Sequence, residues 1–227
     1  MPSQDREFYN ELWTDADLEV AAPDPLLIEN VEGMQAGRAL ELGCGIGANA
    51  VWLAGHGWKV TAVDFSETAI AHARRLAEKR GVNVDFQVGD ATAPPDGPYD
   101  LAITFYIQLQ PDQRMRMLSA MTDALSPGGT LLFVSHDSSM PLPEFTGDGL
   151  DTLTTVEQTL QELAGLTIET AVAYDHSASG AAPHIQHMPV SKETGDQHAH
   201  EDDGKHEHAG HDFNNMISTV VRARKPA

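Results

Sequence analysis

The residues with the clearest chemical meaning form the stretch ALELGCGIGANAVWLA, at positions 39 to 54. A short apolar run leads into three glycines, Gly43, Gly45 and Gly47, and an apolar segment with helical spacing follows them. Glycines between a strand and a helix let a ligand approach the backbone closely, beside the N–H groups that begin the helix. The stretch therefore predicts a site for a nucleotide-like ligand.

Two ligands fit these glycines. A dinucleotide fits because Gly43, Gly45 and Ala48 satisfy the pattern G-x-G-x-x-G/A. S-adenosylmethionine fits because Glu41 begins the pattern acid-x-G-x-G-x-G. Asp64 lies about 20 residues beyond the glycines, where a carboxylate can accept hydrogen bonds from both ribose hydroxyls of either ligand. The glycines and Asp64 leave the choice open.

Candidate catalytic side chains follow two later apolar runs. Phe105 ends the run LAITF and Tyr106 follows it, while His136 and Asp137 come after the run TLLFV. A histidine that a neighbouring carboxylate orients can act as a general base, although a histidine in such a loop is also a common hydrogen-bonding residue. We predict His136 and Tyr106 as the catalytic candidates, with both interpretations of His136 open.

A histidine-rich stretch near the C-terminus offers metal ligands. Its H-x-H pairs and one further histidine give the predicted ligand set His198, His200, His206, His208 and His211. Imidazole suits zinc, nickel and copper, and a flexible chain can wrap such an ion. A solvated acidic loop with incidental histidines is the alternative. From this stretch comes a second hypothesis of function, a protein that binds or buffers metal.

Short apolar runs alternate with amphipathic helical segments along the chain. The predicted strands cover residues 38–42, 59–63, 84–88, 101–105, 130–134 and 166–174. Strict alternation predicts a parallel sheet that binds its ligand beyond the carboxyl ends of the strands. The run NNMISTVVRAR, at 214–224, predicts a last strand with no helix before it, which should pair antiparallel with its predecessor.

Residue types also predict where three helices begin. Asp24 with Pro25 and then Ser66 are typical helix starts, and Gly81 is a typical helix end. Thr154 and Glu157 have the spacing of a capping box.

The length of 227 residues fits one domain, 1–227. Residues 1–24 are polar with scattered aromatic residues and predict a lid-like segment, in which Tyr9 and Trp13 lie across the ligand. Residues 175–212 predict a mobile acidic insertion between the last two strands, because they carry too few large apolar side chains to offset their ordering entropy.

Charge and cysteine content exclude several classes. The formal net charge of −20 repels polyanions, so nucleic acid and anionic membranes are poor partners. Cys44 is the sole cysteine, which rules out an intramolecular disulfide and a cysteine zinc cluster. No segment approaches the ~20 apolar residues of a membrane span, and the N-terminus lacks the pattern of a signal peptide. We expect a cytoplasmic protein.

The motifs ELGCGIG, VDFS, GDAT and LSPGGTLLF, in this order, resemble the class I S-adenosylmethionine-dependent methyltransferases. The resemblance covers roughly residues 25–174 and resumes at the last strand. Within the class, the chain looks most like the small-molecule branch that includes tellurite-resistance and thiopurine-type enzymes. The acid of GDAT separates this reading from the dinucleotide one, since the family places an acid there against the adenine.

The resemblance implies an α/β fold, a Rossmann-like seven-stranded sheet that is mostly parallel with an antiparallel last strand and helices on both faces. It implies S-adenosyl-L-methionine as cofactor, bound by Glu41, Gly43, Gly45, Gly47, Asp64, Phe65, Asp90, Ala91 and Phe105. The implied reaction is in-line methyl transfer to a small-molecule acceptor. The segment TFYIQLQ replaces the D-P-P-Y-like turn of enzymes that methylate nucleic-acid amino groups. The acceptor atom stays open between oxygen, sulfur, nitrogen and a metalloid.

Overall fold

The computed structural model describes residues 3–14, 16, 18, 21–139, 147–178 and 216–227. Within them the chain forms a seven-stranded sheet in the order β3-β2-β1-β4-β5-β7-β6. The strands are β1 Arg38–Leu42, β2 Lys59–Asp64, β3 Asp85–Val88, β4 Tyr99–Phe105, β5 Leu125–His136, β6 Thr167–Asp175 and β7 Ile217–Arg224. β7 pairs antiparallel with both β5 and β6, and the other neighbouring strands are parallel. The predicted fold class is confirmed.

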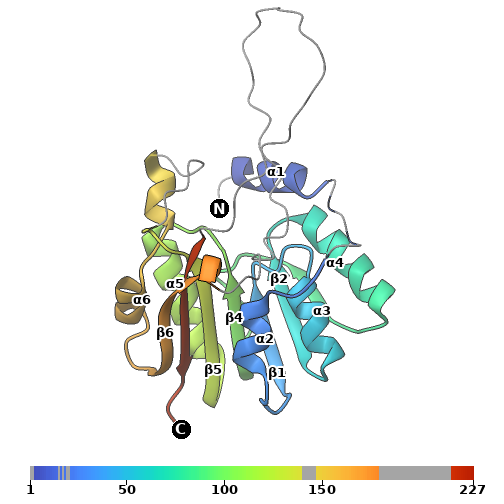
Figure 1. Ribbon diagram of the computed structural model, residues 1–227. Helices are drawn as coiled ribbons and strands as arrows, with labels where there is room; N and C mark the ends of the chain where they lie inside the picture. The colour runs from blue at the N-terminus through green and yellow to red at the C-terminus, as the bar shows by residue number, and fades with distance from the viewer. Residues whose placement is uncertain (1–2, 15, 17, 19–20, 140–146, 179–215) are drawn as a thin grey trace, which may run out of the picture.

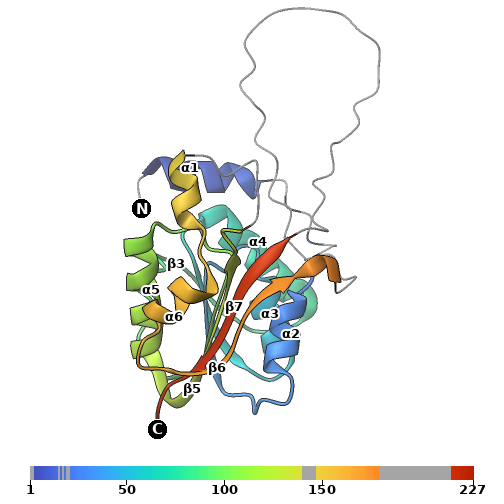
Figure 2. The ribbon, with the colours of Figure 1, turned by 60° about the vertical axis from the view of Figure 1, so that its left-hand side comes forward.

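Helices cover both faces of this sheet. They are α1 Ser3–Leu12, α2 Pro25–Val31, α3 Ala48–Gly55, α4 Glu67–Arg80, α5 Pro111–Ala124 and α6 Val156–Glu162, with the 3-10 turns η1 Gly147–Thr152 and η2 His176–Ala178. Figure 2 shows the sheet nearly edge-on, with α2, α3 and α4 on one face and α5 and α6 on the other. Helix α1 lies across the edge at which the parallel strands end (Figure 1). In the described part of the chain, no helix has both the length and the apolar character to cross a membrane.

Two of the predicted helix starts are confirmed, and the third is wrong by one residue. The Asp24 carboxylate accepts a hydrogen bond from Leu26 N (2.8 Å), and Ser66 Oγ accepts one from Ala69 N (3.1 Å). At α6 the capping box is Thr155 with Gln158, whose side chains each accept a hydrogen bond from the backbone N–H of the other. Thr154 is fully buried and pairs with the end of β5, so it is not available as the cap.

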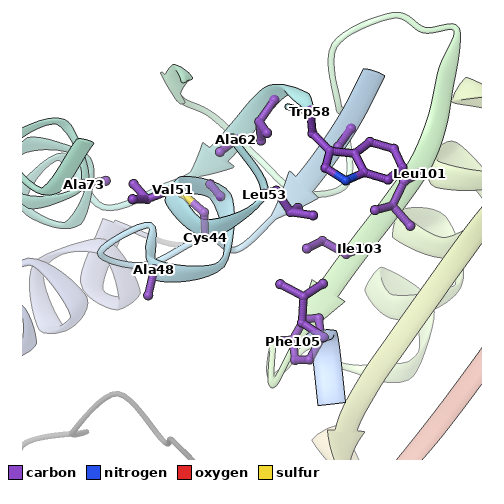
Figure 3. Close-up of a cluster of buried hydrophobic side chains, with 14 of the residues drawn as sticks. Cys44, Ala48, Val51, Leu53, Trp58, Ala62, Ala73, Leu101, Ile103 and Phe105 are labelled. Atoms are coloured by element: carbon purple, nitrogen blue, oxygen red, sulfur yellow. The ribbon is translucent and has the colours of Figure 1, made fainter. Parts of the chain in front are cut away.

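Small buried residues let α3 pack closely on the centre of the sheet. Figure 3 shows the side chains of α3 against those of β2 and β4, among them Leu53, Ala62 and Ile103, none of which is exposed. Closely packed side chains of this kind leave a helix little room to shift. The packing of α3 on the sheet therefore fixes the position of the turn between β1 and α3.

The last two strands carry the histidine-rich insertion between them. β6 extends to Asp175, which pairs with Ile217 of β7, and His176 N donates to Met216 O (2.9 Å). Asp175, the first residue of the predicted insertion, is thus the last residue of β6, and His176 begins the turn η2. The bounds 175–212 of the insertion stay a prediction. Residues 179–215 lie outside the described residues, so their mobility stays a prediction.

Candidate active site

The turn between β1 and α3 needs its glycines for its own geometry. Gly43, Gly45 and Gly47 have φ values of +68°, +51° and +79°, which glycine adopts without strain. A Cβ at Gly43 would lie 2.2 Å from Ile107 Cγ1, and one at Gly47 would lie 2.8 Å from the Ala73 methyl group. The three residues are thus required even before a ligand is considered, and they form the turn at the carboxyl edge of the sheet.

Asp64, the last residue of β2, is bonded directly to this turn. Its Oδ2 accepts a hydrogen bond from Gly45 N (2.8 Å), and its Oδ1 accepts one from Ser66 N (2.9 Å). The side chain is 7% exposed, and burial raises the pKa of its carboxyl above the usual value in spite of these bonds. A carboxylate oxygen has two lone pairs, so each can accept a further hydrogen bond, as the hydroxyls of a ribose would require.

Glu41 lies beneath the start of α3. It accepts hydrogen bonds from the Asn49 side chain and from Ala50 N, while its Oε2 is buried without a hydrogen-bond partner. The residue is 2% exposed, and burial raises the pKa of its carboxyl to about 8. The sequence assigned Glu41 to the cofactor, and the structure places it directly below the turn that the cofactor would approach.

Tyr106 follows β4 in an unusual backbone conformation, with a φ of +54°. A left-handed non-glycine residue is uncommon and is held by its surroundings. Here Tyr106 N donates to Val134 O (2.8 Å), and the phenol lies between the Asp24 carboxyl and Ser218 Oγ, 3.3 Å from the latter. Burial raises the pKa of the phenol well above its ordinary value, so the hydroxyl keeps its proton.

His136, the last residue of β5, packs against Tyr106. The two ring centroids are 4.8 Å apart and the rings are tilted by 33°. The side chain is 5% exposed, and burial, with a smaller contribution from His176, lowers the pKa of the imidazole to about 4. His136 is therefore neutral at physiological pH and is a weak base.

The carboxylate expected to orient His136 is engaged elsewhere. Asp137 Oδ1 accepts hydrogen bonds from Ser139 N and Oγ, and its Oδ2 accepts one from Thr219 Oγ1 (2.7 Å). Asp137 thus fastens the end of β5 to β7. The structure gives no support to a histidine–carboxylate pair at 136 and 137.

The remaining predicted cofactor residues lie on either side of the glycine turn. Phe105 ends β4 and is nearly buried, and Phe65 packs edge-on against Tyr9 of α1, with centroids 5.0 Å apart. Asp90 Oδ1 accepts hydrogen bonds from Thr92 N and Oγ1, which folds the turn after β3 that also contains Ala91. The sheet therefore brings the predicted residues to one edge, with α1 beside Phe65.

Residues 39–129 match the protein family described as Methyltransferase domain. That stretch runs from β1 into β5 and includes the glycine turn and Asp64. The chain thus contains a stretch, about two fifths of its length, that is similar to a methyltransferase domain. Of the two ligands that fit the glycines, this match favours the methyl donor S-adenosylmethionine over a dinucleotide.

Curated relatives of this chain differ in the acceptors that their names state. The ribosomal RNA small subunit methyltransferase C of Alcanivorax borkumensis is 29% identical over 142 residues, which are 59% of this chain and 43% of the relative. The 2-heptyl-1-hydroxyquinolin-4(1H)-one methyltransferase of Mycobacteroides abscessus is 28% identical over 134 residues, 56% of this chain and 59% of the relative. The chain thus spans less than two thirds of either relative.

A solved structure supports the fold over nearly the whole chain. The N-methyltransferase NodS from Bradyrhizobium japonicum WM9, in complex with S-adenosyl-L-homocysteine, has a TM-score of 0.66 at 18% identity and covers 98% of both chains. At this identity the likeness concerns the fold. The tellurite-resistance and thiopurine-type branch stays a prediction.

The predicted metal ligands of the methyltransferase, His198 to His211, lie outside the described residues. Where side chains are described, no group of three or more potential ligands is placed to hold a metal ion.

Sequence reasoning missed three side chains that line the site. Asp24 was predicted only as a helix cap, Asn49 only as a helix residue, and Ser218 only as part of the last strand. Ser218 Oγ lies 3.0 Å from His176 Nε2 as well as close to Tyr106. These contacts join residues 42 to 112 positions apart, and no local pattern in the sequence signals them.

Proposed function

We propose that this methyltransferase transfers a methyl group from S-adenosylmethionine to a small-molecule acceptor. The observation that carries the proposal is the Asp64 carboxylate, bonded to the glycine turn at the carboxyl edge of the sheet. The hydroxyls of a ribose can donate hydrogen bonds to the remaining lone pairs of the Asp64 carboxylate. The turn bears no side chains at three positions, so a ligand can approach its backbone closely.

The residues present suit this cofactor. Two buried carboxyl oxygens without partners, Glu41 Oε2 and Asp24 Oδ2, lie below and beside the turn, where a cationic group would satisfy them. We assign the ribose to Asp64, the methionine portion to Glu41 and the glycine turn, and the adenine to Phe65, Asp90 and Ala91. When bound, S-adenosylmethionine supplies an electrophilic methyl group on a positively charged sulfur.

We assign the acceptor to the neighbouring ends of β4 and β5. Methyl transfer needs alignment and exclusion of water more than a dedicated triad. The Tyr106 hydroxyl, which keeps its proton, is suited to hold an acceptor atom by donating a hydrogen bond. Neutral His136 offers a lone pair that can take up a proton from an acceptor, although weakly because of its low pKa.

A small molecule is the acceptor that charge favours. The net charge of −20 opposes a polyanion such as RNA, although one relative is named for ribosomal RNA. The relative named for a hydroxyquinolone shows that a similar domain serves a small molecule. Methylation of ribosomal RNA but of no small molecule in a screen of both would refute this choice.

Ligand binding tests the cofactor directly. We expect calorimetry to show binding of S-adenosylmethionine and S-adenosylhomocysteine but not of NAD, because the turn after β3 and the acid pair near the glycine turn suit the former. Binding of NAD alone would overturn the assignment of the cofactor.

Replacing His136 by alanine should lower turnover by roughly tenfold, less than a strong general base contributes. The affinity for S-adenosylmethionine should stay within about twofold, because we assign His136 to the acceptor side. Product formation would be measured with an acceptor drawn from a screen of thiols, phenols, amines and metalloid oxyanions. His56→Ala, at an exposed histidine of the α3 end, is the matched control. An unchanged rate in His136→Ala would leave His136 a packing residue.

Metal binding by the insertion stays a prediction from the sequence. We do not propose it as the function, because no observation beyond the H-x-H spacing favours it.

A further inference from the structure

Asp24 is a buried acid whose carboxyl is only partly satisfied. It is 4% exposed at the head of α2, and its Oδ1 accepts a hydrogen bond from Leu26 N (2.8 Å). The Tyr106 hydroxyl donates a hydrogen bond to the carboxyl, whereas Oδ2 is buried without a hydrogen-bond partner. A helix cap needs one carboxyl oxygen, so capping does not account for the second.

Asn49 links Asp24 to the glycine turn. Asn49 is the second residue of α3, two positions after Gly47, and its Oδ1 accepts a hydrogen bond from Asp24 N (2.8 Å). The same side chain donates to Glu41, whose Oε2 is also buried and unpaired. The Asn49 side chain therefore hydrogen-bonds to both Asp24 and Glu41, between the glycine turn and Tyr106. Each of the two acids has one carboxyl oxygen without a hydrogen-bond partner. This is the end of the site to which the methionine portion of the cofactor was assigned above.

The described residues provide no cation for these acids. The ion pairs of the described residues involve other acids. Arg114 of α5 pairs with Glu162 of α6, and two arginines of β7 pair with Glu169 of β6. A carboxylate withdrawn from water without a positive partner is costly, and a cationic ligand would offset the cost. S-adenosylmethionine carries a sulfonium and an ammonium, whereas its product S-adenosylhomocysteine has a neutral thioether in place of the sulfonium.

We propose that Asp24 is a specificity-determining residue that raises the affinity of the methyltransferase for cationic S-adenosylmethionine but not for its neutral-sulfur product. This inference rests on the proposed function. Loss of the positive charge at sulfur removes the attraction to Asp24, so the product binds as it would to a site without this acid.

The pKa values indicate why Asp24 is the charged member of the pair. Burial raises the pKa of its carboxyl to about 6, so it is mostly ionised at pH 7.5. The pKa of Glu41 rises to about 8, so in the free protein Glu41 is mostly protonated at the same pH.

Asp24→Asn tests the proposal, because asparagine keeps the shape and the helix cap but removes the charge. Calorimetry at pH 7.5 would measure the Kd of S-adenosylmethionine, of S-adenosylhomocysteine and of sinefungin, which bears an ammonium in place of the methylsulfonium. We expect about tenfold weaker binding of the two cationic ligands and less than about twofold change for S-adenosylhomocysteine, the scale of one partly screened charge pair. Asp100→Asn, at the opposite end of the sheet, is the control and should change none of them.

Equal weakening of all three ligands, or no weakening, would overturn the role of Asp24 and leave it a structural residue. If Asp24→Asn does not fold, Asp24→Ser retains a good helix cap without the charge and must show the same selective loss. If the unaltered protein binds none of the three ligands, the proposed function fails and this inference fails with it. A selective loss for the cationic ligands alone supports both.

Discussion

Replacing Asp64 by alanine should weaken S-adenosylmethionine binding by ~1.5–3 kcal/mol, the scale of lost hydrogen bonds to a charged acceptor. This corresponds to roughly a 10- to 150-fold rise in Kd, measured by calorimetry. The change removes the ribose acceptor and also the partner of Gly45 N and Ser66 N, so the glycine turn loses its link to β2.

Asp64→Asn separates these two contributions. Its amide can present an oxygen to Gly45 N or to Ser66 N but not to both, so we expect its loss of affinity to approach that of alanine. Asp85→Ala, at an exposed acid that begins β3, is the matched control and should bind as the unaltered protein does. Unaltered affinity in Asp64→Ala would place the ribose elsewhere.

Glu41→Gln should remove a loss of at most about 3–5 kcal/mol in the free energy of unfolding that the unaltered protein suffers as pH rises. This is the scale of a carboxyl pKa raised from 4.5 to about 8. The sign follows from the raised pKa. The folded protein holds a proton on Glu41 that the unfolded chain releases above pH 4.5, so the free energy of unfolding falls as pH rises toward 8. Glutamine has the hydrogen-bonding capacity of the protonated acid without this penalty.

Urea denaturation followed by tryptophan fluorescence would measure the effect. We expect Glu41→Gln and the unaltered protein to unfold with similar free energies near pH 5, and the variant to be the more stable by several kcal/mol near pH 8, within the limit above. Asp24, with a pKa raised to about 6, contributes a decline of the same sign at lower pH in both proteins. Glu32→Gln, at an exposed acid that follows α2, is the control. Parallel curves for Glu41→Gln and the unaltered protein would show that Glu41 is ionised in the folded state.

The strands and most helix ends were predictable because their signals are local. An apolar run such as TLLFV reports burial on both faces of a strand, and Ser66 caps a helix through an atom three residues away. The antiparallel pairing of the last two strands was predictable because no helical pattern separates them in the sequence, whereas the order of the strands in the sheet was not predicted. Where a local signal was ambiguous by one position, as at Thr154 and Thr155, burial decided it.

The polar part of the site was predictable only in outline. Glu41, Asp64 and Tyr106 were recognised by their positions at strand ends, since such ends meet at one edge of a parallel sheet. Sequence proximity paired His136 with Asp137, but successive residues of a strand point to opposite faces, and Asp137 bonds to β7 instead. The link from Glu41 through Asn49 to Asp24 depends on how α2 and α3 sit side by side, which no spacing in the chain encodes.

The bond between His176 N and Met216 O closes the sheet on both sides of the intervening residues 177–215. With its ends so fixed, a connecting segment of twice the length would cost only about 0.6 kcal/mol more in closure entropy. Insertions, deletions and changes of composition in that segment should therefore change the folding free energy of the sheet very little. Histidines in that segment can therefore be gained or lost independently of the packing that holds the sheet together.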